Sequence, residues 1–224
     1  MKFKCLVLDH DDTVVNSTAT IHYPCFEKYL AERKPHLSGK FDLDTYFRKN
    51  FDPGVLEFFA NDVGLSEKEM EEEEYYWRDY VKNHVPRAYP GMKQIMERFL
   101  AEGGILAVAS HSLTCYIERD YKENGLPHPD VIYGWDMPKE KRKPAPFAMQ
   151  DLCERYGLLP EEILMVDDLK PGFDMARAAG VPFAAAGWAH NIEEIASFMR
   201  RHCDYYLSDT AALSLLNFRF SVFP

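Results

Sequence analysis

Short apolar runs that stop abruptly at polar residues recur along this chain, and they constrain its fold more than any other feature. Each run is four to six residues long, which is typical of a buried parallel strand. The runs occupy residues 3–8, 105–109, 163–166 and 181–186. The first ends at Asp9, the second at Ser110 and the third at Asp167, so polar groups are expected at the carboxyl ends of strands.

Segments with helical periodicity separate these runs. Apolar residues recur every three or four positions in 92–100, 149–156 and 192–199, and residues 173–179 before Gly180 also suit a helix. Strands that alternate with helices of this length imply right-handed crossovers. The pattern therefore predicts an α/β fold with a doubly wound parallel sheet, in which ligands bind beyond the carboxyl ends of the strands.

The alternation is interrupted after the first strand. Helices are expected around residues 24–30, 45–51, 54–63 and 66–81, and the last begins with a capping box formed by Ser66 and Glu69. No strand-like run occurs in this region of the sequence. We therefore expect an α/β core domain made of residues 1–15 and 88–224, and a small α-helical domain made of residues 16–87.

Composition limits the classes of function that the chain can have. A hydrophobic content of 46% is enough to build a core, and 36 acidic against 26 basic residues leave a net charge of -10, which argues against nucleic acid as a partner. No signal peptide or membrane-spanning run is visible, and the five scattered cysteines suggest reduced thiols. We expect a cytoplasmic protein with no membrane partner, and a monomer is the default expectation.

Four aspartates stand at the predicted strand ends. Asp9 and Asp11 follow the first strand, and Asp167 and Asp168 follow the third. If these strands are neighbours, the carboxylates crowd together and need a cation to offset their repulsion. Because all the candidate ligands are oxygens, a hard metal such as Mg²⁺ is expected. The alternative is that each aspartate only caps the helix that follows it.

Four short motifs in this order resemble those of the haloacid dehalogenase superfamily. Residues 9–13 match its Asp-x-Asp-x-Thr motif, Ser110 its second motif and residues 143–146 its Lys-Pro-x-Pro motif, and residues 167–180, with the two aspartates and Pro171-Gly172, resemble the fourth. The helical insertion is similar to the C1-type cap of phosphoglycolate phosphatase-like and β-phosphoglucomutase-like members. The resemblance implies a Rossmann-like core with a cap that selects the substrate.

Roles for four residues follow from their chemistry and agree with this resemblance. Asp9 is expected to attack phosphorus and form an aspartyl-phosphate. Asp11 is expected to protonate the leaving oxygen and later to activate the hydrolytic water. Ser110 would donate a hydrogen bond to a phosphoryl oxygen, and Lys143 would offset the negative charge on the nucleophile and the phosphoryl group.

The metal and substrate contacts complete the expected site. Mg²⁺ would be held by Asp9, Asp168 and Asp11, the last through its backbone carbonyl as the resemblance implies, with Asp167 as a further ligand or an orienting group. The substrate would contact Ser110, Lys143 and His111, with Ser112 as a further candidate contact. The alternative for His111 is an exposed loop histidine. The hydroxyl of Thr13 is expected to bond within the first loop.

The chain departs from the family pattern at three positions. Asp12 stands where many relatives have glycine, so another carboxylate lies beside the site, although aspartate tolerates the backbone angles of such a turn. Asn16 stands where aspartate is frequent, and Leu169 replaces a small polar residue. The local charge at Asp12, the hinge at Asn16 and the hydrogen bonding at Leu169 therefore cannot be carried over from the family.

The leading hypothesis is a Mg²⁺-dependent phosphomonoester hydrolase that acts on a small phosphorylated metabolite. It depends on Asp11, because relatives that cleave carbon–halogen or phosphonate bonds usually lack a carboxylate there. One alternative is a phosphosugar mutase of the β-phosphoglucomutase type. Another is a non-catalytic domain that binds a phosphorylated ligand or a protein, with the apolar residues 215–223 as an interface.

Overall fold

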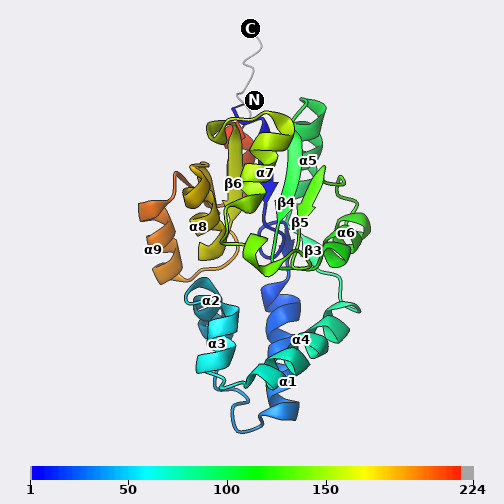
Figure 1. Ribbon diagram of the computed structural model, residues 1–224, viewed down its shortest axis with the longest axis vertical. Coiled ribbons are helices and arrows are strands. Elements are labelled where there is room, and N and C mark those ends of the chain that lie inside the picture. The colour runs from blue at the N-terminus through cyan, green and yellow to red at the C-terminus, as the bar shows by residue number, and fades with distance from the viewer. Residues whose placement is uncertain (1, 218–224) are drawn as a thin grey trace. The chain divides into compact units, whose positions relative to one another are not determined.

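The computed structural model describes residues 2–217, and within it the chain forms two compact units (Figure 1). The first unit contains the chain up to Val15 and from Arg87 onward, and the second contains Asn16–Pro86. Most of the apolar stretch at residues 215–223 lies outside the described residues.

A six-stranded parallel sheet forms the centre of the first unit. Its strands, in spatial order, are β5 (Val131–Tyr133), β4 (Ile105–Ala109), β1 (Cys5–Leu8), β6 (Ile163–Asp167), β7 (Phe183–Ala186) and β8 (Tyr205–Leu207). Every neighbouring pair in this order is parallel. The predicted α/β class with a doubly wound parallel sheet is therefore confirmed.

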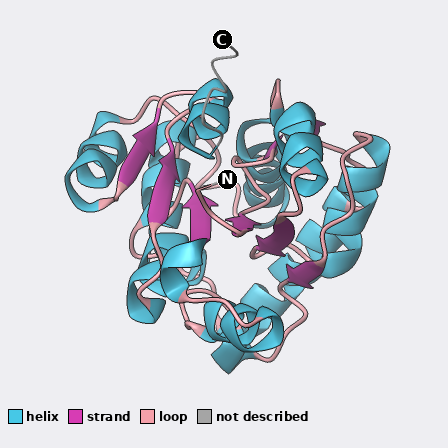
Figure 2. Cartoon of the chain, turned by 90° about the horizontal axis from the view of Figure 1, so that it is seen from above, coloured by secondary structure: helices cyan, strands magenta, loops and turns pink. Residues whose placement is uncertain are grey.

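Helices lie on both sides of the strands (Figure 2). Leu6 and Leu8 of β1 face a core shared with α5 (Met92–Ala101), α6 (Thr114–Glu123) and α10 (Thr210–Asn217). The opposite face is covered by α7 (Phe147–Tyr156), α8 (Lys170–Ala179) and α9 (Glu193–His202). Because both faces are buried, the inner strands are continuously apolar rather than alternating.

The order of the strands places a topological switch point between β1 and β6. From β1 the chain proceeds outward through β4 to β5, then returns to β6 on the other side of β1 and proceeds through β7 to β8. The connections that leave β1 and β6 therefore diverge, and in open α/β sheets ligands bind beyond the carboxyl ends of the strands at such a point.

Two helices in this unit end at glycines, one of them the Gly180 that the sequence indicated. Gly157 and Gly180 end α7 and α8 with φ values of 63° and 68°, in the left-handed region that glycine enters without strain. Helix α8 begins at Lys170, earlier than the expected residue 173. Short 3₁₀ turns cover Lys139–Lys141 and Pro160–Glu162.

The second unit is helical, as expected. After a π-helical turn at Thr18–His22, it contains α1 (Tyr23–Arg33), α2 (Leu43–Phe51), α3 (Val55–Asn61) and α4 (Glu67–Val81). The predicted capping box at Ser66 and Glu69 is present. Phe26, Phe58 and Phe59 pack ring against ring at its core.

Two short strands pair where the chain leaves the first unit and returns to it. They are β2 (Val15–Asn16) and β3 (Arg87–Ala88). Across residues 2–217, none of the helices combines the length and the apolar character needed to traverse a bilayer.

Candidate active site

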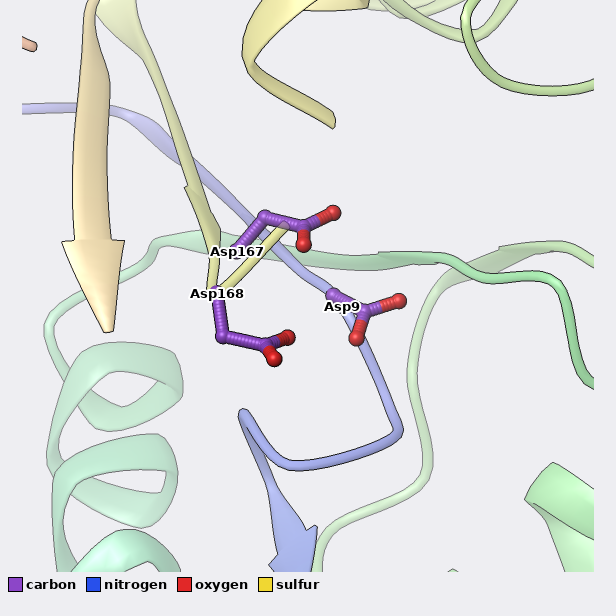
Figure 3. Close-up of side chains that lie close together, drawn as sticks. All are labelled: Asp9, Asp167 and Asp168. Carbon is purple, nitrogen blue, oxygen red and sulfur yellow. The ribbon is translucent and has the colours of Figure 1, made fainter. Parts of the chain in front are cut away.

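Three carboxylates converge beyond the ends of β1 and β6. The two strands are paired in register at Leu8 and Val166, and the Asp9 N–H donates to the Val166 carbonyl at 2.9 Å. Asp9, Asp167 and Asp168 each offer a ligand atom, and these atoms lie within 4.8 Å of one another. Figure 3 shows the three side chains gathered at this edge. The pairing of β1 with β6 therefore joins two motifs that are far apart in the sequence.

Asp168 has the properties expected of a metal ligand. Both of its carboxylate oxygens are buried and have no hydrogen-bond partner among the described residues. A buried carboxylate without partners is strongly destabilising unless a cation or a proton neutralises it. Asp168, with Asp9 and Asp167 beside it, therefore forms a candidate metal site whose oxygen donors suit a hard divalent cation.

Lys143 joins the nucleophile candidate to the fourth motif. Its ammonium lies 2.7 Å from Asp9 Oδ1 and 2.7 Å from Asp167 Oδ2, and its side chain is only 6% exposed. Burial disfavours the charged ammonium, but Asp167 and Asp9 outweigh burial and raise the pKa of Lys143. The lysine therefore remains positively charged inside the site.

Asp167 is fixed from two further directions. Its Oδ1 accepts the Leu169 N–H at 2.8 Å. Gly172 lies in the first turn of α8, and a Cβ there would approach Asp167 Oδ2 to 2.0 Å. The glycine of the fourth motif is thus required because this carboxylate packs directly against the helix. Lys143 and the Leu169 N–H therefore hold this carboxylate in a defined orientation.

Crowding and burial make the ionised cluster unfavourable in the absence of a cation. Burial raises the pKa of Asp9 well above its usual value; the Lys143 ammonium opposes this shift, while Asp167 and Asp11 add to it. Burial, Asp12 and Asp167 likewise raise the pKa of Asp168. A bound cation would offset the same repulsion without a proton.

Asp11 is held by the segment that follows β4. Ser112 Oγ donates to Asp11 Oδ2 at 2.6 Å, and Ser110 Oγ donates to the same oxygen at 3.4 Å. The Ser112 N–H donates in turn to Ser110 Oγ at 3.0 Å. Both serines are buried. The pairing of β1 with β4 thus places the second motif beside the first.

His111 faces the segment that carries Lys143. Its Nε2 lies 3.1 Å from the Lys143 carbonyl, which can only accept, so Nε2 carries a proton. Its ring packs edge to face against Trp135, with 5.3 Å between ring centroids. Burial and the Lys143 charge lower the pKa of His111 to about 4, so the imidazole is neutral near pH 7.

The first loop accommodates Asp12 in place of glycine. Asp12 adopts φ 59°, in the left-handed region, and its N–H donates to the Val15 carbonyl at 2.7 Å. Its carboxylate is buried and close enough to raise the pKa of Asp168. The expectation for Thr13 is wrong, because its buried hydroxyl has no hydrogen-bond partner among the described residues. Its carbonyl instead accepts the Trp188 indole N–H at 3.1 Å.

The sequence did not predict two contacts near the cluster. Ser112, expected only as a substrate contact beside His111, donates to Asp11 Oδ2. His10, between Asp9 and Asp11, turns away from the cluster. Its Nε2 lies 3.1 Å from Asp120 Oδ2 within the core of the first unit.

Comparison with known proteins identifies the family. A sequence model described as haloacid dehalogenase-like hydrolase matches residues 6–186, most of the chain. The chain belongs to the haloacid dehalogenase-like hydrolase family. The helical unit between β1 and β4 occupies the place of the C1-type cap in this family.

Individual relatives of this haloacid dehalogenase-like chain are phosphatases or resemble it in fold. It is 29% identical over 141 residues to phosphoglycolate phosphatase of Mannheimia succiniciproducens. The matched region covers 62% of this chain and 61% of that relative's length. The crystal structure of a predicted phosphoglycolate phosphatase from Haemophilus somnus is similar, with a TM-score of 0.73, 22% identity and coverage of 97% and 99% of the two chains.

A further similar structure has a bound sugar bisphosphate. It is CbbY of Rhodobacter sphaeroides in complex with xylulose-1,5-bisphosphate, with a TM-score of 0.69, 19% identity and coverage of 94% of this chain and 99% of that one. At such identities the two structures show a shared fold.

Replacement of Asp168 by Asn is expected to abolish stabilisation by Mg²⁺. Burial raises the folded-state pKa of Asp168 well above its usual value, so the wild type without metal should lose stability as pH rises from that usual value through the folded-state pKa. Saturating Mg²⁺ should restore about 5 to 10 °C in Tm at pH 8. Asp168→Asn should lose less stability over this pH range and show no response to Mg²⁺.

Thermal unfolding of both proteins in EDTA and in Mg²⁺ checks this result. Asp174→Asn is the matched control, since Asp174 lies on α8 and pairs with Lys170 outside the cluster. This control should keep the full Mg²⁺ response. A Mg²⁺-dependent rise in Tm that persists in Asp168→Asn would contradict the assignment of Asp168 as a ligand.

Proposed function

We propose that this protein is a Mg²⁺-dependent phosphomonoester hydrolase that acts on a small phosphorylated metabolite through an aspartyl-phosphate on Asp9. One observation carries the proposal. A buried carboxylate, Asp9, is paired with the Lys143 ammonium at 2.7 Å, and a second carboxylate, Asp11, is held two residues later by hydrogen bonds from the β4 segment. A nucleophile and a separate acid–base group are the two functions that ester hydrolysis through a covalent intermediate requires.

In this reaction Asp9 attacks phosphorus while the bond from phosphorus to the ester oxygen breaks. Asp11 gives its proton to the leaving oxygen, and then takes a proton from the water that hydrolyses the aspartyl-phosphate. Ser110 donates to a phosphoryl oxygen, and Lys143 compensates the negative charge that both phosphoryl-transfer steps place near Asp9. His111, neutral near pH 7, lies beside Ser110 as a substrate contact.

The oxygen-rich cluster supports the assignment of the cation. Mg²⁺ would be held by Asp9, Asp168 and the Asp11 carbonyl, with Asp167 as a further ligand or an orienting group, and when bound it would neutralise charge on the phosphoryl oxygens. The contacts of Asp167 with Lys143 and the Leu169 N–H favour the orienting role.

The substrate class is a small phosphate monoester, with phosphoglycolate as the first candidate. The curated relative from Mannheimia succiniciproducens is a phosphoglycolate phosphatase, and CbbY of Rhodobacter sphaeroides binds a sugar bisphosphate. The net charge of -10 disfavours polyanions, and a helical cap suits a molecule that can be enclosed.

Release of inorganic phosphate by the purified full chain tests the proposal. The panel contains p-nitrophenyl phosphate, phosphoglycolate, xylulose-1,5-bisphosphate and β-glucose 1-phosphate, each with Mg²⁺ and with EDTA. We expect turnover of p-nitrophenyl phosphate and faster turnover of one metabolite, both abolished by EDTA and restored by excess Mg²⁺.

Two results would contradict this function. Isomerisation of β-glucose 1-phosphate, primed by glucose 1,6-bisphosphate and without net release of phosphate, would favour the mutase. Absence of any turnover across the panel with Mg²⁺ present would favour a non-catalytic domain that binds a phosphorylated ligand.

A further inference from the structure

Ser112 stands at the centre of the contacts that hold Asp11. Its hydroxyl donates to Asp11 Oδ2 at 2.6 Å, whereas the hydroxyl of Ser110 is 3.4 Å from the same oxygen. Ser112 is 3% exposed, so water competes little for this hydrogen bond. When Asp11 is ionised, a hydroxyl that donates to this half-buried carboxylate at such a distance makes a charge-assisted hydrogen bond, which is stronger than a neutral one.

The backbone of Ser112 is anchored on both sides. Its backbone N–H donates to Ser110 Oγ at 3.0 Å, and its carbonyl accepts the backbone N–H of Trp135 at 2.8 Å. The hydroxyl therefore extends from a fixed point. Because a carboxyl group rotates about its bond to Cβ, a fixed donor on one oxygen determines which way the group faces.

The hydrogen bond from Ser112 to Asp11 becomes more important during the reaction, because Ser110 can donate to only one acceptor at a time. A serine hydroxyl has one proton to donate. When the Ser110 proton bonds to a phosphoryl oxygen, it no longer supports Asp11, whereas the hydrogen bond from Ser112 to Oδ2 can persist.

We propose that Ser112 is a positioning residue that orients Asp11 for proton transfer to the leaving oxygen, an inference that rests on the proposed phosphatase function. In the step concerned, Asp9 forms a bond to phosphorus, the bond to the ester oxygen breaks, and the proton of Asp11 passes to that oxygen. In this role Ser112 acts through Asp11 rather than through a contact with the substrate. Its loss therefore weakens protonation of the leaving group specifically.

The test compares kcat/KM for phenyl phosphate and p-nitrophenyl phosphate with Mg²⁺ present. Phenolate is a strong base, with a conjugate-acid pKa of about 10, and needs a proton as it leaves, whereas p-nitrophenolate leaves readily without one. In Ser112→Ala we expect kcat/KM to fall about tenfold for phenyl phosphate and about twofold for p-nitrophenyl phosphate. The ratio of the two values does not depend on the fraction of protein that is folded.

Thr114→Ala provides the matched control. Its hydroxyl also donates to a carboxylate, Asp136 Oδ1 at 2.7 Å, two residues further along the same segment but away from the cluster. This variant should leave the ratio unchanged. Asp11→Asn should shift the ratio further than Ser112→Ala, and the double variant should equal Asp11→Asn, because Ser112 acts only through Asp11.

The possible outcomes separate this inference from the proposed function. An equal loss on both esters in Ser112→Ala, or an additional shift in the double variant, would overturn the role of Ser112 while the phosphatase function stands. A wild type inert toward both esters would overturn the proposed function, and the inference with it.

Discussion

Asp9→Asn is expected to reduce kcat for p-nitrophenyl phosphate by roughly 10⁴-fold or more. A carboxamide is a very poor nucleophile and cannot form the aspartyl-phosphate, so the reaction loses its covalent route. The substitution also removes one charge from the ion pair with Lys143. Steady-state kinetics with saturating Mg²⁺ measure the effect, and acid-quenched protein analysed by mass should carry one phosphoryl group in the wild type and none in the variant.

Asp12→Asn is the matched control for this prediction. Asp12 is a buried carboxylate of the same loop, and asparagine tolerates its φ of 59°, so the substitution makes the same chemical change three residues away. We expect a loss of less than about tenfold in kcat. If Asp9→Asn kept activity comparable to that of Asp12→Asn, Asp9 would not be the nucleophile.

Lys143→Met is expected to lower kcat by about 10² to 10³-fold and to destabilise the fold by about 3–5 kcal/mol. The catalytic loss follows from removing the charge that balances Asp9 and the phosphoryl group. The loss of stability follows because Asp9 and Asp167 would remain buried without the ammonium that lies 2.7 Å from each. Kinetics with p-nitrophenyl phosphate and urea unfolding in EDTA measure the two effects separately.

Lys139→Met tests whether any lysine of this basic segment would behave in the same way. Lys139 is exposed, so this variant should keep the kcat of the wild type. Its free energy of unfolding should change by no more than about 0.5 kcal/mol. Equal effects in the two variants would indicate a general charge effect and would argue against a specific role for Lys143.

The alternating pattern of the sequence was sufficient to predict the α/β class and the helical insertion. The inner strands are buried on both faces, so each leaves a continuous apolar run that can be recognised locally. Strands β5 and β8 have only three residues each, and they lie at the two edges of the sheet. Their formation depends on neighbouring strands rather than on local sequence, so the pattern did not indicate them.

The sequence also identified the residues at strand ends whose side chains can act in catalysis or metal binding. A carboxylate directly after a buried apolar run is informative because parallel strands direct their carboxyl ends to one edge. This reasoning selected Asp9, Asp11, Asp167 and Asp168, and the structure brings the carboxylates of Asp9, Asp167 and Asp168 to within 4.8 Å of one another. The carboxylate of Asp11 contacts Ser110 and Ser112 instead.

Only the tertiary structure decided which of these side chains contact one another. The sequence contains three lysines between residues 139 and 143, and it is the fold that brings Lys143 Nζ to both Asp9 and Asp167. In the same way, the sequence suggests Ser112 only as a substrate contact, and the pairing of β1 with β4 brings it beside Asp11. Local sequence determines which elements form and where their polar ends lie, because periodicity and capping act within a few residues. The contacts among those ends depend on strand order and register, which are set by packing across the whole sheet.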